Sequence, residues 1–411
     1  MSESPESPPE GRLAKTLAYY GTFIGLGLAL ASLGPTLPGL AELTGSSLSA
    51  ISTIFVARSA GYLTGAMLGG RLFDRLPGHP LMAGMLALMA LSLALVPFSS
   101  TATLLTFALY ALGFGEGAVD VGGNTLLVWL YPTGLGPWMN GLHFFFGIGA
   151  FASPLVISKV IETTGSLTTA YWILAALLVP FILFVGVQPS PAIAKHASER
   201  ELEFGKNRVT IWLVAGLLFA TVGAEVGYGN WIYTYSMTQN LADTVSAAEL
   251  TSSYWGAFTI GRLAGIPLAT RTSPKNIMYL CFAGIAVASL AILALPDSAR
   301  SLWAGTIAAG LAVAPMFATV ISLAESRMPI SGRATGWFFV GSSTGGMSIP
   351  WVIGQLFETL GTNWTFYVVL ADVFVGIVVL VIFNCCSDKN QRIPNRAESN
   401  PPSRLPSETW K

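Results

Sequence analysis

The sequence predicts an all-α membrane protein in which twelve transmembrane helices form two pseudosymmetric six-helix bundles. Three observations lead to this fold class. The 411 residues are 53% hydrophobic and only 10% charged, whereas a soluble domain carries about 25% charged residues. Apolar stretches close to the roughly 20 residues that cross a bilayer recur along the chain. Finally, two stretches in the first half of the chain are similar to two stretches in the second.

Twelve apolar stretches are the candidate membrane-spanning helices. In chain order they are about 13–33, 48–70, 80–97, 102–130, 138–160, 168–187, 209–238, 247–270, 276–295, 301–324, 333–357 and 363–383. The longest polar interruption, 188–208, follows the sixth stretch, so we expect a linker there between bundles at 13–187 and 209–383. We expect 1–12, which lacks the basic start of a signal peptide, to be a disordered cytoplasmic tail, and 384–411 a second tail.

The internal repeat can be followed residue by residue. The segment 149–175 aligns with 345–371 without a gap at an offset of 196, and more than a third of the aligned positions are identical. The segment 113–132 matches 310–329 in length, from glycine to proline, at an offset of 197. Parallel repeats of six helices are typical of one large transporter class, in which the substrate site lies between the halves near the middle of the membrane.

The distribution of basic residues predicts the orientation. With the N-terminus inside, 17 of the 21 Lys and Arg residues fall in inner segments. Loops on the cytoplasmic side carry an excess of Lys and Arg. We therefore expect both termini and the central linker to be cytoplasmic, and the plasma membrane is the expected location.

The loop after the second stretch, "GGRLFDRLPGHP" (69–80), resembles the Gly-x-x-x-Asp-Arg signature of the major facilitator superfamily. Gly70, Asp74 and Arg75 keep its spacing, while Pro77 shifts the following glycine and His79 stands where a basic residue is usual. The resemblance implies the major facilitator fold and a gating role for this loop. The alternative is a solvated turn that caps a helix.

Three further motifs narrow the resemblance. "DVGGN" (120–124) is similar to an element of the fucose–galactose–glucose:proton symporter family. "NGLHFFFGIGAFASPL" (140–155) and "GAEVGYGNWIYTY" (223–235) are most similar to its branch of sodium-dependent glucose transporter-like proteins. The resemblance implies a carrier of a neutral hexose, coupled to Na⁺ or H⁺. The first stretch, however, lacks the acidic residue that some proton-coupled members carry there, so the coupling ion stays open.

Charged residues inside the predicted spans are functional candidates, because a charge in the bilayer is costly unless it faces a partner or a water-filled cavity. They are Arg58, Glu116, Asp120, Glu225, Arg262 and Asp372. Asp120 is the predicted ion-coupling residue and a candidate for holding Na⁺, with Glu116 one turn away as a second candidate. Arg58 and Arg262 are the predicted charge partners. The alternative is that Asp120 is locked in a structural pair with Arg58.

The predicted substrate-binding residues supply amide, imidazole, carboxylate and indole groups, which can bind sugar hydroxyls and the apolar face of a sugar ring. They are Asn124, Asn140, His143, Glu225, Asn230 and Trp231. For His143 the alternative is a structural histidine. For Trp231 it is an anchor at the membrane surface.

The sequence thus predicts a secondary transporter that moves glucose or a similar hexose by alternating access. Two alternatives remain: an exporter of amphipathic organic compounds and a nutrient receptor that transports nothing. We expect no enzyme, because no catalytic motif lies in its required context, and no cofactor other than a coupling ion. A net charge of zero gives no support to a nucleic-acid partner. The expected partners are the sugar and the lipid bilayer, and the expected state is a monomer.

Overall fold

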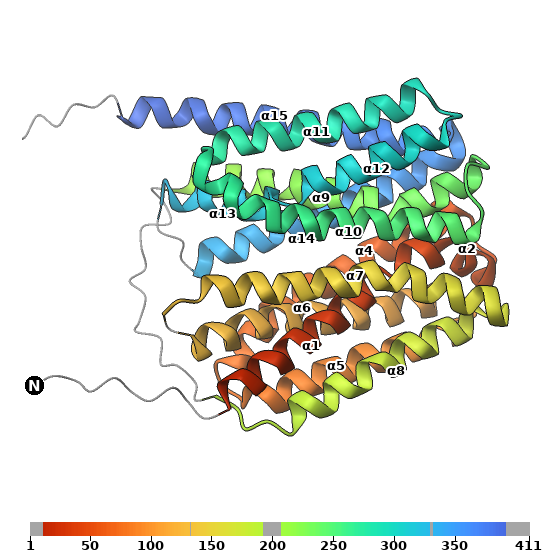
Figure 1. The fold of residues 1–411 in the computed structure, drawn as a ribbon, viewed down its shortest axis with the longest axis horizontal. Helices are drawn as coiled ribbons and strands as arrows, with labels where there is room; N and C mark the ends of the chain where they lie inside the picture. The colour runs from red at the N-terminus through yellow and green to blue at the C-terminus, as the bar shows by residue number, and fades with distance from the viewer. Residues whose placement is uncertain (1–10, 132, 192–206, 329–331, 392–411) are drawn as a thin grey trace, which may run out of the picture.

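The computed structural model describes residues 11–131, 133–191, 207–328 and 332–391, and helices make up almost all of this part of the chain (Figure 1). Most of the predicted tails and of the predicted linker lies outside the described residues. The N-terminal half holds α1 (Arg12–Leu30), α2 (Leu33–Thr44), α3 (Leu48–Ile51), α4 (Thr53–Phe73), α5 (Gly78–Leu95), the 3-10 helix η1 (Val96–Phe98), α6 (Ala102–Leu130), α7 (Gly136–Thr164) and α8 (Leu167–Gly186). The C-terminal half holds α9 (Arg208–Thr238), α10 (Thr244–Arg271), α11 (Pro274–Ala294), α12 (Ala299–Val313), α13 (Met316–Glu325), α14 (Gly332–Leu360) and α15 (Trp364–Gln391).

All twelve predicted spans are occupied by helix in the described residues. Nine helical stretches in this part of the chain are long and apolar enough to cross a membrane. There are up to ten if α2 and the α3–α4 stretch, which meet at a bend of 115°, form one span. The stretches that miss this measure include α10 and α14, which are 28 and 29 residues long. Both are more polar because they contribute side chains to the cavity described below.

The first predicted span, 13–33, is longer than expected and is broken. Helix α1 ends at Leu30, and α2 resumes at Leu33 and continues to Thr44. Pro35 has no N–H to donate to the carbonyl of Ala31, but proline is tolerated in the first turn of a helix. The helix therefore breaks before Pro35 and restarts around it, which hydrophobicity alone did not reveal.

Glycines bring α4 and α6 into close contact. A Cβ atom on Gly61 or Gly65 of α4 would overlap the backbone of α6 at Tyr110 or Phe114. In return, Gly113 of α6 lies against the backbone of α4. Small residues four apart allow such close approach between membrane helices, where van der Waals packing rather than the hydrophobic effect drives association.

The same glycine contact identifies equivalent positions in the two halves. Gly113 lies against the backbone of Arg58 and Tyr62, and Gly310 of α12 lies against that of Tyr254 and Phe258 of α10. Arg58 and Tyr62 therefore correspond to Tyr254 and Phe258 at an offset of 196, which matches the offset of the sequence repeat.

The halves touch at one end of the molecule, which we call the closed end and which holds α2 and α3 (right in Figure 1). Here a Cβ on Gly34 of α2 would lie 3.1 Å from the Cα of Asn230 of α9. The Glu358 carboxylate of α14 accepts hydrogen bonds from the backbone N–H groups of Leu48 (2.7 Å) and Ser49 (3.1 Å). The Gln355 side chain adds a bond to the Ser49 carbonyl at 2.9 Å.

Candidate functional site

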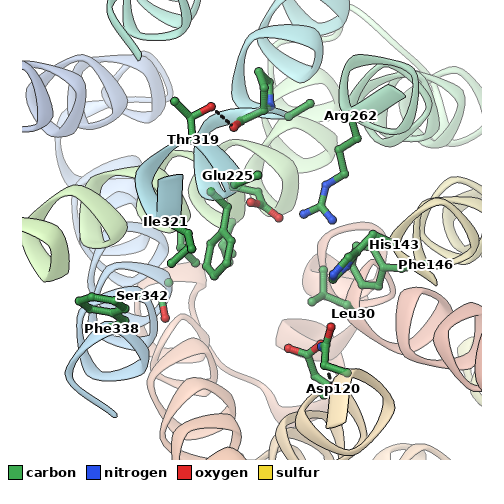
Figure 2. Close-up of a pocket in the computed structure, with 18 of the residues that line it drawn as sticks. Leu30, Asp120, His143, Phe146, Glu225, Arg262, Thr319, Ile321, Phe338 and Ser342 are labelled. Carbon is green, nitrogen blue, oxygen red and sulfur yellow. Dashed lines mark hydrogen bonds between the residues drawn. The ribbon is translucent and has the colours of Figure 1, made fainter. Parts of the chain in front are cut away.

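A cavity of about 920 Å³ lies between the two halves. It extends away from the closed end to the opposite end of the helices, where Asn140, Pro274 and Glu325 line it. Figure 2 shows side chains of both halves that face this space. The predicted site residues that line it are Arg58, Glu116, Asp120, Asn124, Asn140, His143, Glu225, Asn230 and Arg262. Helices far apart in sequence thus bring most of the predicted residues together.

Asp120 of α6 is held by two donors from its own half. The Tyr62 hydroxyl of α4 donates to Oδ2 of Asp120. The Asn124 amide, one turn along α6, donates to Oδ1 at 3.0 Å and to the Asp120 backbone carbonyl at 2.8 Å. Sequence reasoning missed Tyr62, although a signal was present: Tyr62 follows Arg58 by four residues, as Asp120 follows Glu116.

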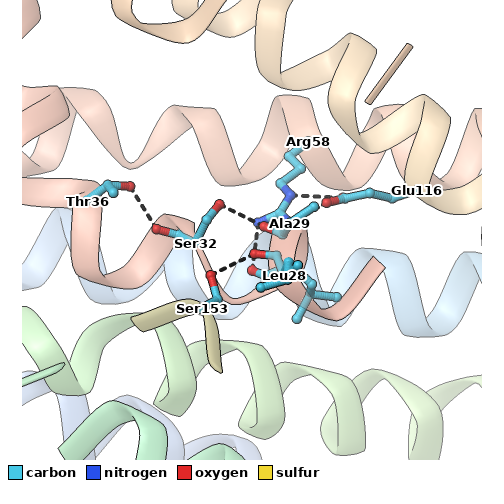
Figure 3. A network of polar contacts seen from close by, with 8 residues as sticks. Leu28, Ala29, Ser32, Thr36, Arg58, Glu116 and Ser153 are labelled. Atoms are coloured by element: carbon cyan, nitrogen blue, oxygen red, sulfur yellow. Dashed lines mark hydrogen bonds and ion pairs between the residues drawn. The ribbon is translucent and has the colours of Figure 1, made fainter. Parts of the chain in front are cut away.

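Arg58 pairs with Glu116, as Figure 3 shows. Its Nε and Nη2 atoms donate to the two carboxylate oxygens of Glu116 at 2.9 and 2.5 Å. The same guanidinium donates to the carbonyls of Ala29 (3.0 Å) and Leu30 (3.1 Å), where α1 ends. Asp120 is therefore not locked in a pair with Arg58, and Arg58 instead binds carbonyl groups at the C-terminal end of α1, where the break interrupts the regular helical hydrogen bonds.

Hydroxyl groups complete this network around the helix break (Figure 3). Ser153 of α7 donates to the Leu28 carbonyl at 2.7 Å. Ser32 donates to the Ala29 carbonyl at 2.7 Å, and Thr36 donates to the Ser32 carbonyl at 2.8 Å. The break is thus a built feature whose polar groups are satisfied inside the protein, as the membrane interior requires. Because Glu116 is only 1% exposed, its main contacts are structural.

Glu225 and Arg262 are the charged residues that the C-terminal half places around the centre of the cavity (Figure 2). The Arg262 guanidinium lies 4.5 Å from the ring centre of Phe258 and 6.0 Å from that of Phe146, a residue of the other half. Arg262 interacts electrostatically with both Glu225 and Asp120. Within the described residues it forms no ion pair as close as 4 Å. One positive charge thus lies within electrostatic range of a carboxylate in each half.

His143 and the cavity amides differ in how far they are free to bind a ligand. The His143 ring meets Phe23 edge-on at 5.7 Å and has no hydrogen bond in the described part of the chain. Asn140 is exposed nearer the cavity mouth. Asn230 is 3% exposed and donates to the Val226 carbonyl at 2.8 Å, so its Nδ2 group is already engaged.

The structure places Trp231 outside the cavity lining. It is fully buried, and its Nε1–H donates to the Pro350 carbonyl at 2.9 Å. Its ring lies 6.3 Å from that of Phe55 in the other half and 5.0 Å from that of Phe357. In this conformation Trp231 packs the closed end, and it is not at the surface where an interfacial anchor would lie.

The predicted gating loop and one of the intramembrane charges also lie away from the cavity. Gly70 is in the last turn of α4, and Asp74 and Arg75 follow it as exposed residues. Asp372 of α15 is 3% exposed and lies close to Gly223 of α9. None of these residues contacts the centre of the cavity, so the gating role of the loop stays a prediction.

Comparison with known proteins places the chain in a family. Residues 13–331 match the model described as Major Facilitator Superfamily, which covers well over half of the chain. The chain belongs to the major facilitator superfamily. It is therefore an integral, multi-pass membrane protein of a transporter family, which confirms the predicted fold class and the prediction that it is not an enzyme.

Curated relatives support the more detailed resemblance. A protein of Xenopus laevis named sodium-dependent glucose transporter 1 is 32% identical over 359 residues, which are 80% of this chain and 73% of that protein. The protein of the same name from Homo sapiens is 30% identical over 372 residues, 82% of this chain and 72% of its own length. The relationship to this branch, read from the sequence motifs, is confirmed.

Solved structures agree on the fold. The crystal structure of a D-xylose-proton symporter superposes with a TM-score of 0.73 over 90% of this chain and 97% of that chain, at 14% identity. A nucleoside transporter, NupG, gives a TM-score of 0.71 over 92% of this chain and 99% of that chain, at 16% identity. At such identities the likeness shows the fold alone.

Proposed function

We propose that this major facilitator transporter moves a neutral monosaccharide, glucose or a similar hexose, together with a monovalent cation. The observation that carries the proposal is the composition of the cavity centre. The opposite charges of Arg58 and Glu116 cancel within their ion pair. The other charged residues there are Asp120, Glu225 and Arg262. With both carboxylates ionised they leave one net negative charge, which a cation can balance while the substrate is neutral.

The polar groups around these charges suit a sugar. Asn124, Asn140 and His143 line the same cavity, and amide and imidazole groups both donate and accept hydrogen bonds. The aromatic rings of Phe23, Phe144 and others form the apolar part of the wall. Pockets that are mostly apolar with a few placed polar groups are typical of small-molecule sites.

Asp120 is the proposed ion-coupling residue, because it is a carboxylate near the cavity centre whose geometry is fixed by neighbouring donors. Glu116 is a weaker candidate, since both of its oxygens are bound by Arg58. The names of the relatives, sodium-dependent glucose transporter 1, support both the sugar and the choice of Na⁺ as the first ion to test.

The predicted orientation in the membrane determines the side to which the cavity opens. With both termini in the cytoplasm, the closed end faces outward and the cavity opens to the cytoplasm, as in an inward-facing carrier. Gly70, Asp74 and Arg75 are then cytoplasmic, as a gating loop between α4 and α5 requires. We propose a monomer in the plasma membrane.

The test is uptake of radiolabelled glucose into proteoliposomes under an imposed Na⁺ gradient, and separately under an H⁺ gradient at equal Na⁺. We expect uphill accumulation driven by one gradient alone, lost in Asp120→Asn. Equal uptake under both gradients would indicate a facilitator and remove the coupling role. No uptake under any condition would overturn the sugar proposal.

A second candidate, an exporter of amphipathic compounds, is favoured by one observation. A mostly apolar side pocket between α7 and α10 shares Asn140, Phe144, Leu263 and Ile266 with the central cavity. An apolar opening toward neighbouring helices would suit a ligand that enters from the bilayer. Binding of a hydrophobic cation, but not of glucose, to the purified protein would favour this candidate.

A further inference from the structure

We infer that Tyr62 is a positioning residue, whose hydroxyl fixes the Asp120 carboxylate in the orientation that receives the coupling cation. This inference rests on the proposed function and deepens it. Tyr62 of α4 lines the cavity and donates its O–H to Oδ2 of Asp120 on α6. Asn124 occupies the other oxygen, Oδ1, at 3.0 Å. The carboxylate is thus held from both sides and is not free to rotate.

Comparison of the two pseudosymmetric halves distinguishes side-chain features that the helix packing requires from features that serve the cation site. Position 62 corresponds to Phe258, because Gly113 and Gly310 make the same backbone contact in their respective halves. Position 120 corresponds to Phe317 at the offset of 197. The hydroxyl and the carboxylate are therefore both present in one half and both replaced by phenylalanine in the other.

An aromatic ring without a hydroxyl packs well at this helix crossing. Phe258 is fully buried against the α10–α12 contact. The crossing therefore accommodates an aromatic ring at this position without the oxygen that Tyr62 carries. The oxygen has one described hydrogen bond, to Asp120, so its role is tied to that carboxylate.

The positive charge of Arg262 explains why the Tyr62 hydroxyl matters for Asp120. This guanidinium interacts electrostatically with Asp120 from the opposite half. If the Tyr62 hydroxyl is removed, Oδ2 of Asp120 loses its donor, and the attraction of Arg262 then acts on a carboxylate that is held through Oδ1 alone. A carboxylate bound to arginine is a poorer cation ligand, because its charge is already balanced. Tyr62 thus keeps Asp120 available to the cation in the inward-facing conformation.

The decisive variant is Tyr62→Phe, reconstituted in proteoliposomes. The cation concentration that half-saturates uptake is measured first, and then the sugar KM at saturating cation. Loss of one hydrogen bond to a charged group predicts an increase of about 10- to 150-fold in the half-saturating cation concentration. The sugar KM at saturating cation should change by less than about twofold, because the cation site is then filled in both proteins and the sugar binds to the same loaded state.

Tyr228→Phe is the matched control. It also removes one buried tyrosine hydroxyl, which bonds to Thr306 at 3.2 Å. Tyr228 lies on α9, stacks on Tyr254 at 5.2 Å, and is absent from the cavity lining. We expect neither constant to change, apart from any loss of protein stability.

A second measurement does not depend on transport. The cation-induced rise in the melting temperature of the purified protein should be present in the wild type and in Tyr228→Phe. It should be much smaller in Tyr62→Phe and absent in Asp120→Asn. Tyr62→His, which restores an N–H donor beside the carboxylate, should recover part of the rise and covers the case in which Tyr62→Phe fails to fold.

The outcomes distinguish the inference from the proposed function. If Asp120→Asn abolishes the cation response while Tyr62→Phe leaves it unchanged, the inference is wrong and the proposed function stands. If Tyr62→Phe raises only the sugar KM, Tyr62 is a sugar contact and the inference is also wrong. If Asp120→Asn leaves the cation response intact, both the proposed coupling site and the positioning role fail.

Discussion

The two halves of the protein share a backbone plan but carry different side chains at one pair of equivalent helix crossings. Between α4 and α6, the pairs Arg58–Glu116 and Tyr62–Asp120 form a polar ladder one helical turn apart. The equivalent positions between α10 and α12–α13 hold Tyr254 with Val313 and Phe258 with Phe317. The C-terminal half instead contributes Glu225 and Arg262 from other positions, and the equivalent of Arg262 in the first half is Ala66.

The helix crossing therefore forms with glycines and aliphatic or aromatic side chains alone, and the charges of the N-terminal half contribute to the cavity. The N-terminal half holds its charged groups in fixed hydrogen bonds. The C-terminal half leaves a guanidinium that interacts with carboxylates on both sides. Binding of a cation and a neutral solute would therefore change how Arg262 is shared, and with it the attraction between the halves.

Removing the charge of Arg58 from the polar ladder should have the strongest effect. Arg58→Met leaves Glu116 buried and unpaired, which typically costs about 3–5 kcal/mol of stability. We expect a large drop in the melting temperature of the detergent-solubilised protein. The double variant Arg58→Met, Glu116→Leu resembles the apolar C-terminal half and should recover much of that loss. A single variant as stable as the wild type would show that the pair does not support the helix break.

Asp120→Asn tests whether ion coupling belongs to the N-terminal half. The substitution keeps the size of the side chain but removes its charge, and hydrogen bonds and contacts to a charged group are worth about 1.5–3 kcal/mol, or roughly 10- to 150-fold. We expect cation-stimulated uptake to fall to background while downhill sugar exchange persists. The comparison variant Glu225→Gln should retain cation stimulation. The reverse pattern would assign coupling to the C-terminal half.

Glu162 and Glu358 are identical residues of the repeat with different contacts. Glu162 pairs with Lys159 at 2.9 Å on its own helix, and both side chains are at least half exposed. Glu358 instead bonds to the backbone of α3 in the other half at 2.7 and 3.1 Å. Glu358→Gln should weaken the closed end and raise the population open at that end by about 5- to 30-fold.

Opening of the closed end in Glu358→Gln can be measured with spin labels at Glu42→Cys and Thr359→Cys, both of which are exposed near that end. The distance between the two labels should increase. Glu162→Gln is the control and should leave the distances as they are, because an exposed ion pair contributes only about 0–1 kcal/mol. An equal response of both variants would mean that Glu358 acts through general surface charge.

The smallest effect is expected at His143, whose repeat equivalent is Phe339. Both side chains line the cavity. His143→Phe makes the two halves alike and removes one neutral hydrogen-bonding group, which predicts a rise in sugar KM of about 2- to 12-fold. The half-saturating cation concentration should stay constant. An unchanged sugar KM would mean that His143 lines the cavity without binding the sugar.

From the amino-acid sequence alone we predicted the fold class, the repeat and the charged residues near the centre of the cavity. Charges are so costly inside a bilayer that each one in a predicted span is conspicuous. Helical periodicity also placed Asn124 one turn from Asp120 on the same face. Within a single helix, spacing along the chain fixes which side chains are neighbours.

Which helices pack together, and which of their side chains are in contact, became known from the three-dimensional structure. The sequence could not show that Arg58 pairs with Glu116, that Tyr62 holds Asp120, or that Trp231 packs the closed end. These contacts depend on the axial register between α4 and α6 and between α9 and α14, which close backbone approach at glycines such as Gly61 and Gly345 sets. A shift of one residue in that register would bring different side chains into contact. The hydrophobicity pattern of a single helix does not specify the register.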